Sequence, residues 1–142
     1  MFSLIITIVS IALVVALVAA AMFHGGSEAL TKGKQEAEIT TAISSINQIQ
    51  SAVMAYTAHT GQAPVTMSDL VPQYLRTPPD TWGVEGVPTS LTGVTAGKLT
   101  VGDETQRLES CRIINQRKGL TGEPPSCDAI SSTFIGCCVS NP

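Results

Sequence analysis

Charged side chains are scarce in this 142-residue chain: they make up 13% of it, against about a quarter of an average soluble domain. Lysine and arginine together number 8 and the acidic residues 11, so there is no basic excess and nucleic-acid binding is disfavoured. Only two histidines and no Cys-x-x-Cys motif are present, which disfavours a catalytic metal site. No nucleophile, base and orienting acid stand out as a set. We therefore expect no enzymatic activity and no cofactor.

The charge that is present begins late, because no charged side chain precedes Glu28. Residues 1–23 read MFSLIITIVSIALVVALVAAAMF, and as a helix they would span about 35 Å, enough to cross a bilayer core. A cleaved secretory signal is disfavoured, since no positive residue precedes the run and its apolar part exceeds the about 7–15 residues of a signal core. A plain single-pass anchor fits the length, although its flanking basic residues, Lys32 and Lys34, lie on one side only.

Three hydroxyl side chains interrupt this apolar run. Ser3, Thr7 and Ser10 are spaced four and three residues apart, which places them on one face of a helix. One interpretation is that each hydroxyl bonds back to a carbonyl one turn earlier and does nothing more. The other is a polar seam that packs against neighbouring helices. In that second interpretation the run is an assembly helix, and its residues of interest are Met1, Phe2, Ser3, Ile5, Thr7, Ser10 and Val14.

A second helical pattern follows a pair of glycines. Gly25 and Gly26 each weaken a helix by about 1 kcal/mol relative to alanine, so we expect a bend or an unwound turn there. Beyond them, apolar residues recur at spacings of three and four and predict an amphipathic helix over 27–58, capped by Ser27 or Thr31. The expected division is a hydrophobic transmembrane or filament-core helix over 1–26 and a globular domain over 27–142.

The remainder of the globular domain is predicted to be a loop over 59–81 and then strands and a second helix over 82–142. A short helical turn is expected within 66–75, and a helix over 103–118 has acidic residues at its start, basic residues at its end and Gly119 as its stop. Short strands are predicted at 82–87, 90–95, 98–101 and 133–139, with glycines and prolines that suit hairpins. The expected fold is α+β, in which the long helix packs on a small antiparallel sheet with a disulfide-bounded C-terminal region.

All four cysteines lie in the last third of the chain, at Cys111, Cys127, Cys137 and Cys138. An even number in a glycine- and proline-rich segment indicates disulfides. Zinc binding and a redox-active thiol site are the weaker alternatives, since the usual pair spacings are missing. A Cys137–Cys138 bridge is disfavoured because adjacent Cα atoms lie only about 3.8 Å apart, which leaves two connectivities. Along a strand Cys137 and Cys138 point to opposite faces, so each can reach a different partner. The face that Cys137 shares with Ile135 and Val139 is the more apolar partner for the helix stripe of Leu108, Cys111 and Ile114, which favours Cys111–Cys137 with Cys127–Cys138 slightly over the exchanged pairing.

In layout the chain resembles the type IV pilin family, and within it the type IVb branch. The resemblance rests on residues 1–56, with an uncharged helix continued by an amphipathic half, and on Cys111 with Cys137 or Cys138. The stretch Asp80-Thr81-Trp82-Gly83 is also similar to the Asp-Pro-Trp-Gly of secretion-system pseudopilins, with Thr81 in place of proline. The absence of a leader before Met1 suggests the processed form. One departure is clear: most pilins have glutamate as the fifth mature residue, whereas this chain has Ile5.

The resemblance implies a structural subunit of a type IV pilus or related filament, with a surface domain available for adhesion, conjugation or aggregation. Its implied partners are further copies in a helical filament, the inner membrane before assembly, the assembly machinery and a prepilin peptidase. The implied location is an extracellular filament. The alternative is a membrane-anchored periplasmic binding or secretion-accessory protein, or a minor pseudopilin.

Overall fold

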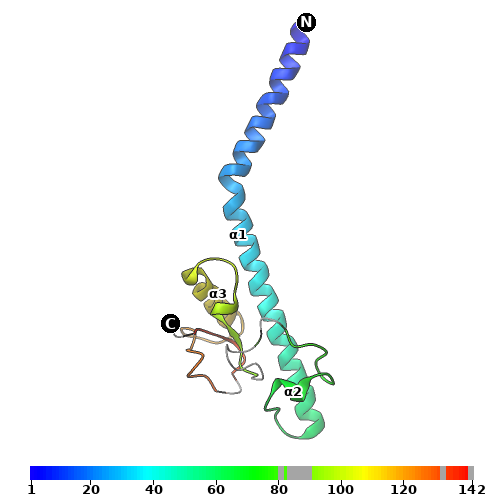
Figure 1. Ribbon diagram of the computed structural model, residues 1–142, viewed down its shortest axis with the longest axis vertical. Coiled ribbons are helices and arrows are strands. Elements are labelled where there is room, and N and C mark those ends of the chain that lie inside the picture. The colour runs from blue at the N-terminus through cyan, green and yellow to red at the C-terminus, as the bar shows by residue number, and fades with distance from the viewer. Residues whose placement is uncertain (80–81, 83–90, 132–133, 141–142) are drawn as a thin grey trace. The chain divides into compact units, whose positions relative to one another are not determined.

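The chain begins with helix α1 (Phe2–Thr60), which contains 59 of the 142 residues in this computed structural model (Figure 1). The structure describes residues 1–79, 82, 91–131 and 134–140. Within them the shorter elements are α2 (Met67–Leu70), β1 (Val94–Thr95), the 3-10 turn η1 (Ala96–Lys98), α3 (Glu104–Arg117) and β2 (Cys137–Cys138). A long helix with a small sheet and two disulfides confirms the α+β class. The chain divides into two compact units, Met1–Lys34 and Gln35–Pro142.

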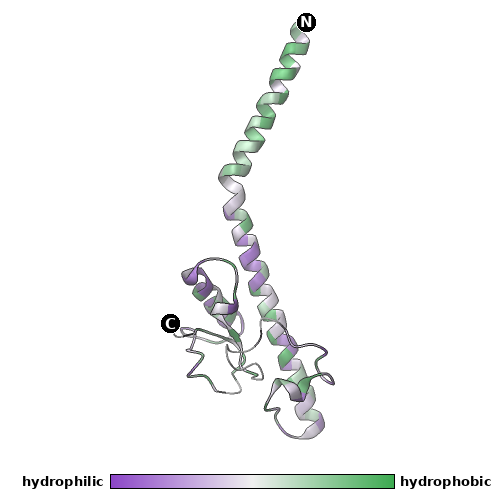
Figure 2. Cartoon of the chain, in the orientation of Figure 1, coloured by the Kyte–Doolittle hydropathy of each residue, from purple (hydrophilic) through white to green (hydrophobic). Residues whose placement is uncertain are grey.

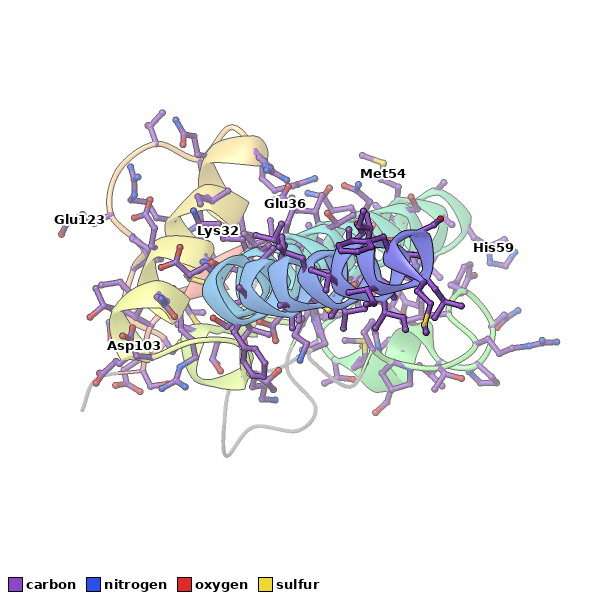
Figure 3. The ribbon with its side chains drawn as sticks, turned by 90° about the horizontal axis from the view of Figure 1, so that it is seen from above. Lys32, Glu36, Met54, His59, Asp103 and Glu123 are labelled. Atoms are coloured by element: carbon purple, nitrogen blue, oxygen red, sulfur yellow. A yellow bond between two sulfur atoms is a disulfide. The ribbon has the colours of Figure 1, made fainter. Side chains whose placement is uncertain are left out.

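The second half of α1 is amphipathic, as its sequence predicts. Its buried residues recur every three or four positions and are Ile39, Ala42, Ile46, Ile49 and Ala52. Met54 lies off this face, and Figure 3 shows its side chain pointing away from the helix. The helix ends where expected, at Gly61, whose φ of 73° lies in the left-handed region and whose N–H donates to the Thr57 carbonyl at 2.9 Å.

The unwound turn, one of the two alternatives predicted at Gly25 and Gly26, is not present, because α1 is helical through both residues. The hydroxyl of Thr31, proposed as a cap for a new helix, instead donates to the carbonyl of Ser27 at 2.8 Å within the continuous helix. An interruption would leave backbone N–H and C=O groups without partners on both sides and require a second helix nucleus. That cost exceeds the penalty of about 1 kcal/mol that each glycine adds.

The sheet is parallel, so the predicted antiparallel arrangement is wrong. β1 pairs with β2 in the register Val94↔Cys137 and Thr95↔Cys138. Between the two strands the chain passes through η1 and α3, and a helical crossover returns the chain to the same end of the sheet. A further parallel bridge joins Ser126 to Val139. Both residues of each strand are buried, so these strands lack the alternation of a half-exposed sheet.

The predicted strands are longer than those observed. The strand expected at 98–101 is wrong, since Lys98 ends η1 and the carboxylate of Glu38 accepts hydrogen bonds from the N–H groups of Thr100 and Val101. Those two donors are therefore not available to a strand ladder. The strand expected at 90–95 is confirmed only at 94–95, and that at 133–139 only at 137–138. The strand expected at 82–87 lies outside the described residues except for Trp82, which is buried.

The two short helices are where the sequence places them. α2 falls within the turn predicted at 66–75, and Asp69 caps it by accepting from the N–H groups of Val65 and Thr66. α3 begins after Asp103, whose side chain accepts from Gln106 N at 2.8 Å. It is followed by Gly119 with a φ of 77°. Its inward face holds four buried residues, Ser110, Cys111, Ile114 and Asn115.

Two glycines allow the strands to approach. A Cβ built on Gly93 would lie 1.6 Å from the carbonyl oxygen of Gly136, a backbone atom that cannot move aside alone. We therefore expect Gly93→Ala to lower the free energy of unfolding by about 2–3 kcal/mol, as overpacking against backbone does. The measurement is the urea midpoint of the full chain in detergent micelles, followed by Trp82 fluorescence.

Gly97→Ala is the matched control, because a Cβ there meets its nearest atom at 3.7 Å, an ordinary contact. Its midpoint should move by less than about 0.5 kcal/mol in free energy. Equal midpoints for the Gly93 and Gly97 variants would show that Gly93 is not a point of close approach.

Candidate functional site

The most prominent feature of the N-terminal unit is an exposed apolar surface. The segment Phe2–Phe23 has a mean hydropathy of 3.0, and none of it is buried within the chain. In Figure 2 this half of α1 is almost uniformly hydrophobic, and polar residues begin after it. By length and composition the segment can cross a membrane, and a signal sequence meets the same criteria. In water so large an apolar surface is unfavourable, so lipid or protein must cover it.

The residues predicted to form an assembly helix all lie on this segment. The large apolar members are exposed: Met1, Phe2, Ile5 and Val14. Among the hydroxyl residues, Thr7 Oγ1 donates to the carbonyl of Ser3 at 2.7 Å and Ser10 Oγ donates to the carbonyl of Ile6 at 2.8 Å. The hydroxyl protons of Thr7 and Ser10 are thus used within the helix. A hydroxyl oxygen bonded in this way still offers acceptor lone pairs to a neighbouring molecule.

A second line of small residues was missed in the sequence analysis. Ala12, Ala16 and Ala20 are spaced four residues apart and are exposed. At about 100° of rotation per residue, this line and the hydroxyl line lie on roughly opposite sides of the helix. The signal that finds it is the same spacing rule that identified the hydroxyls, applied to alanine. Small side chains on two sides permit close approach of other helices on both.

The two disulfides of the C-terminal unit have the pairing that the sequence analysis favours. Disulfides join Cys111 to Cys137, with Cα atoms 5.3 Å apart, and Cys127 to Cys138, with Cα atoms 5.1 Å apart. All four predicted cysteines are therefore paired, and none is a free thiol or thiolate ligand for zinc. The first bridge ties α3 to β2, and the second ties the segment after α3 to the same strand.

Polar side chains hold the second half of α1 against the elements that follow, and sequence reasoning missed them. Arg117 of α3 forms an ion pair with Glu36 at 2.7 Å. Lys118 Nζ donates to Asn47 Oδ1 at 2.7 Å and to Gln50 Oε1 at 2.8 Å. These partners are 68 to 81 residues apart along the chain. No periodic or local signal links residues so distant, so one sequence alone could not reveal them.

The described part of the C-terminal unit has grooves of about 150, 410 and 450 Å³. The groove of about 150 Å³ lies between η1, the first half of α3 and the residues after β2, and its lining residues are Ala96, Gly97, Glu104, Arg107, Leu108, Val139 and Ser140. Within the described part of the chain, no group of three or more histidine, cysteine or acidic residues is placed to hold a metal ion. The arrangement offers an exposed apolar helix and a disulfide-linked C-terminal unit as its functional features.

Comparison of the chain with protein-family models, with curated proteins and with solved structures gives no match. Function is therefore inferred from the residues and their geometry.

The two disulfides close loops of different length, which predicts different contributions to stability. The bridged residues are 26 apart for Cys111–Cys137 and 11 apart for Cys127–Cys138. If restriction of the unfolded chain dominates, replacing the first pair with alanine should cost about 3–4 kcal/mol and replacing the second about 3 kcal/mol. Urea unfolding of the two double-alanine variants measures both costs. A larger loss from the Cys127–Cys138 pair would contradict this account.

Proposed function

We propose that this chain is a structural subunit of a type IV pilus or a related filament. The observation that carries the proposal is the exposed apolar segment Phe2–Phe23 at the start of a chain whose later part forms a disulfide-bonded unit. The layout resembles that of type IV pilins, most of all the type IVb branch. In this role the apolar segment forms the filament core and the C-terminal unit forms its outer surface.

The physical basis is that lipid and a bundle of identical apolar helices are similar surroundings. Each large apolar side chain removed from water contributes about 1.5–3 kcal/mol, whichever of the two covers it. A subunit stored in the inner membrane therefore moves into a filament core without exposing this surface to water. The polar unit enters neither environment and stays outside. The implied partners are copies of the same chain, the inner membrane, an assembly machinery and a prepilin peptidase.

Assembly in this chain would rely on packing more than on charge. Most pilins have a glutamate at the fifth mature position, thought to neutralise the terminal amine of a neighbour, and here Ile5 occupies that place. The hydroxyl line and the alanine line lie on opposite sides of the helix, so one helix has close-packing surfaces for two neighbours. Such head-to-tail contacts between unlike surfaces extend into open helical polymers unless the rotation closes a ring.

The alternative is a membrane-anchored periplasmic binding or secretion-accessory protein, or a minor pseudopilin. In that role lipid alone covers the apolar segment, and the C-terminal unit works as a single copy. The same exposed helix supports it. The two functions differ in whether the chain leaves the membrane as a polymer.

Shearing of cells that express the chain tests the proposal. A filament subunit should appear in the sheared fraction as polymers visible by negative-stain electron microscopy. Val14→Asp should abolish polymers, because an unpaired charge in an apolar helix bundle costs several kcal/mol. The altered chain should stay in the membrane fraction, since one acidic residue costs only about 2.5–3.5 kcal/mol on insertion.

Val14→Leu is the matched control and should assemble normally, because it keeps the apolar character of the position. Normal polymers from Val14→Asp would contradict the packing of this segment in a filament core. If the unaltered chain stays with the membrane after shearing, the anchored-protein alternative is favoured instead.

A further inference from the structure

The side chain of Asn115 is bonded to the backbone of a single cysteine. Asn115 Nδ2 donates to the carbonyl of Cys137 at 2.8 Å, and the N–H of Cys137 donates to Asn115 Oδ1 at 2.7 Å. The asparagine is 3% exposed, so both bonds lie in the interior, where an unpaired amide would be costly. The side-chain amide therefore makes both backbone hydrogen bonds that a paired residue of a neighbouring strand would make.

This contact sets which way each of the two adjacent cysteines faces. Consecutive side chains of a strand point to opposite faces, so holding the backbone of Cys137 directs its sulfur to one face and that of Cys138 to the other. Cys111 precedes Asn115 by one helical turn and lies on the same side of α3. The helix face that holds the Cys137 backbone thus also presents Cys111 to the Cys137 sulfur. If β2 were shifted by one residue relative to α3, Cys138 would lie next to Cys111 in place of Cys137.

The residue that follows β2, Val139, is bonded in agreement with this register. Val139 N donates to the Pro125 carbonyl at 2.9 Å, and Cys127 N donates to the Val139 carbonyl at 2.8 Å. These bonds bring Cys127 beside the strand, where it pairs with Cys138. Asn115 thus bonds to the backbone of Cys137, and the 125–127 segment bonds to the backbone of Val139, two residues further along the chain.

We propose that Asn115 is a positioning residue that selects the disulfide pairing of this chain. By holding Cys137 in register before oxidation, it favours Cys111–Cys137 with Cys127–Cys138 over the exchanged Cys111–Cys138 with Cys127–Cys137. In each oxidation two thiols lose two protons and two electrons to a disulfide oxidant, which becomes two thiols. This inference is independent of the proposed function, since it concerns the maturation of the C-terminal unit alone.

Two variants of the full chain, each with two cysteines, test the preference in detergent micelles. One keeps Cys111 and Cys137 and the other keeps Cys111 and Cys138, with alanine at the remaining two positions. Equilibration with oxidised and reduced glutathione gives the effective concentration of each thiol pair. We expect the effective concentration of the native pair, Cys111 and Cys137, to be at least about tenfold higher than that of the exchanged pair, Cys111 and Cys138. Two buried hydrogen bonds would provide a preference of this size. In about 6 M guanidinium chloride the effective concentrations of the two thiol pairs should agree within about twofold, because loops of nearly equal length close with similar entropy.

Asn115→Ala, introduced into both variants, should reduce the ratio to less than about threefold, because both hydrogen bonds to Cys137 are lost. The effective concentration of the native thiol pair should fall, and that of the exchanged pair should rise. Ile114→Ala is the matched control: Ile114 is the adjacent residue and is fully buried in the core, and its apolar side chain cannot hydrogen-bond to the backbone of Cys137. It should lower both effective concentrations by a similar factor and leave the ratio near tenfold.

Three results would overturn the proposal. One is a ratio that stays near tenfold after Asn115→Ala. Another is a ratio that Ile114→Ala reduces as much as Asn115→Ala does. The third is a fall of both pairs to their values in denaturant after Asn115→Ala, because Asn115 would then stabilise the fold in general without selecting the partner of Cys111.

Discussion

The packing of the C-terminal unit depends on two adjacent residues, which join its sheet to both of its disulfides. Cys137 and Cys138 form the whole of β2, they pair with β1, and each is the end of a different disulfide. The backbone carbonyl of Cys137 also accepts a hydrogen bond from Asn115 Nδ2, and its N–H donates one to Asn115 Oδ1. Because one dipeptide contacts a helix, a strand and a loop, the unit has a defined core although the sheet in its described residues consists of two short strands. Small domains with little regular structure commonly rely on such cross-links.

The N-terminal unit follows a different physical rule. Its apolar residues find no partners within their own unit, so its stability as a helix in water is not assured by tertiary packing. Backbone hydrogen bonds within the helix satisfy its polar groups, which is the condition for a segment that resides in lipid or among other helices. The hydroxyls of Thr7 and Ser10 obey the same condition by donating to carbonyls of their own helix.

Elements whose signals are local could be predicted from the sequence. The spacing of Ile39, Ile46 and Ile49 located the amphipathic half of α1, and Asp103 and Gly119 located the ends of α3. For the cysteines the sequence left two connectivities, and the apolar strand face shared by Ile135, Cys137 and Val139 slightly favoured the one observed. The direction of the sheet did not, because a strand of two residues has the same local pattern in either orientation. Glu38 was also missed, since it reaches Thr100 across 62 residues and prevents a strand there.

The location of the cross-links determines how the C-terminal unit would respond to mechanical force. Neither disulfide includes a residue of α1, so this helix is joined to α3 and to the 99–101 segment by side-chain contacts such as Glu36–Arg117 and Glu38–Thr100. Tension applied between the start of α1 and the end of the chain would therefore break noncovalent contacts first, before either disulfide carried load. The segment from Cys111 to Cys138 would stay closed throughout. The unit is thus built to yield at its helix and to keep a folded remnant from which it can re-form.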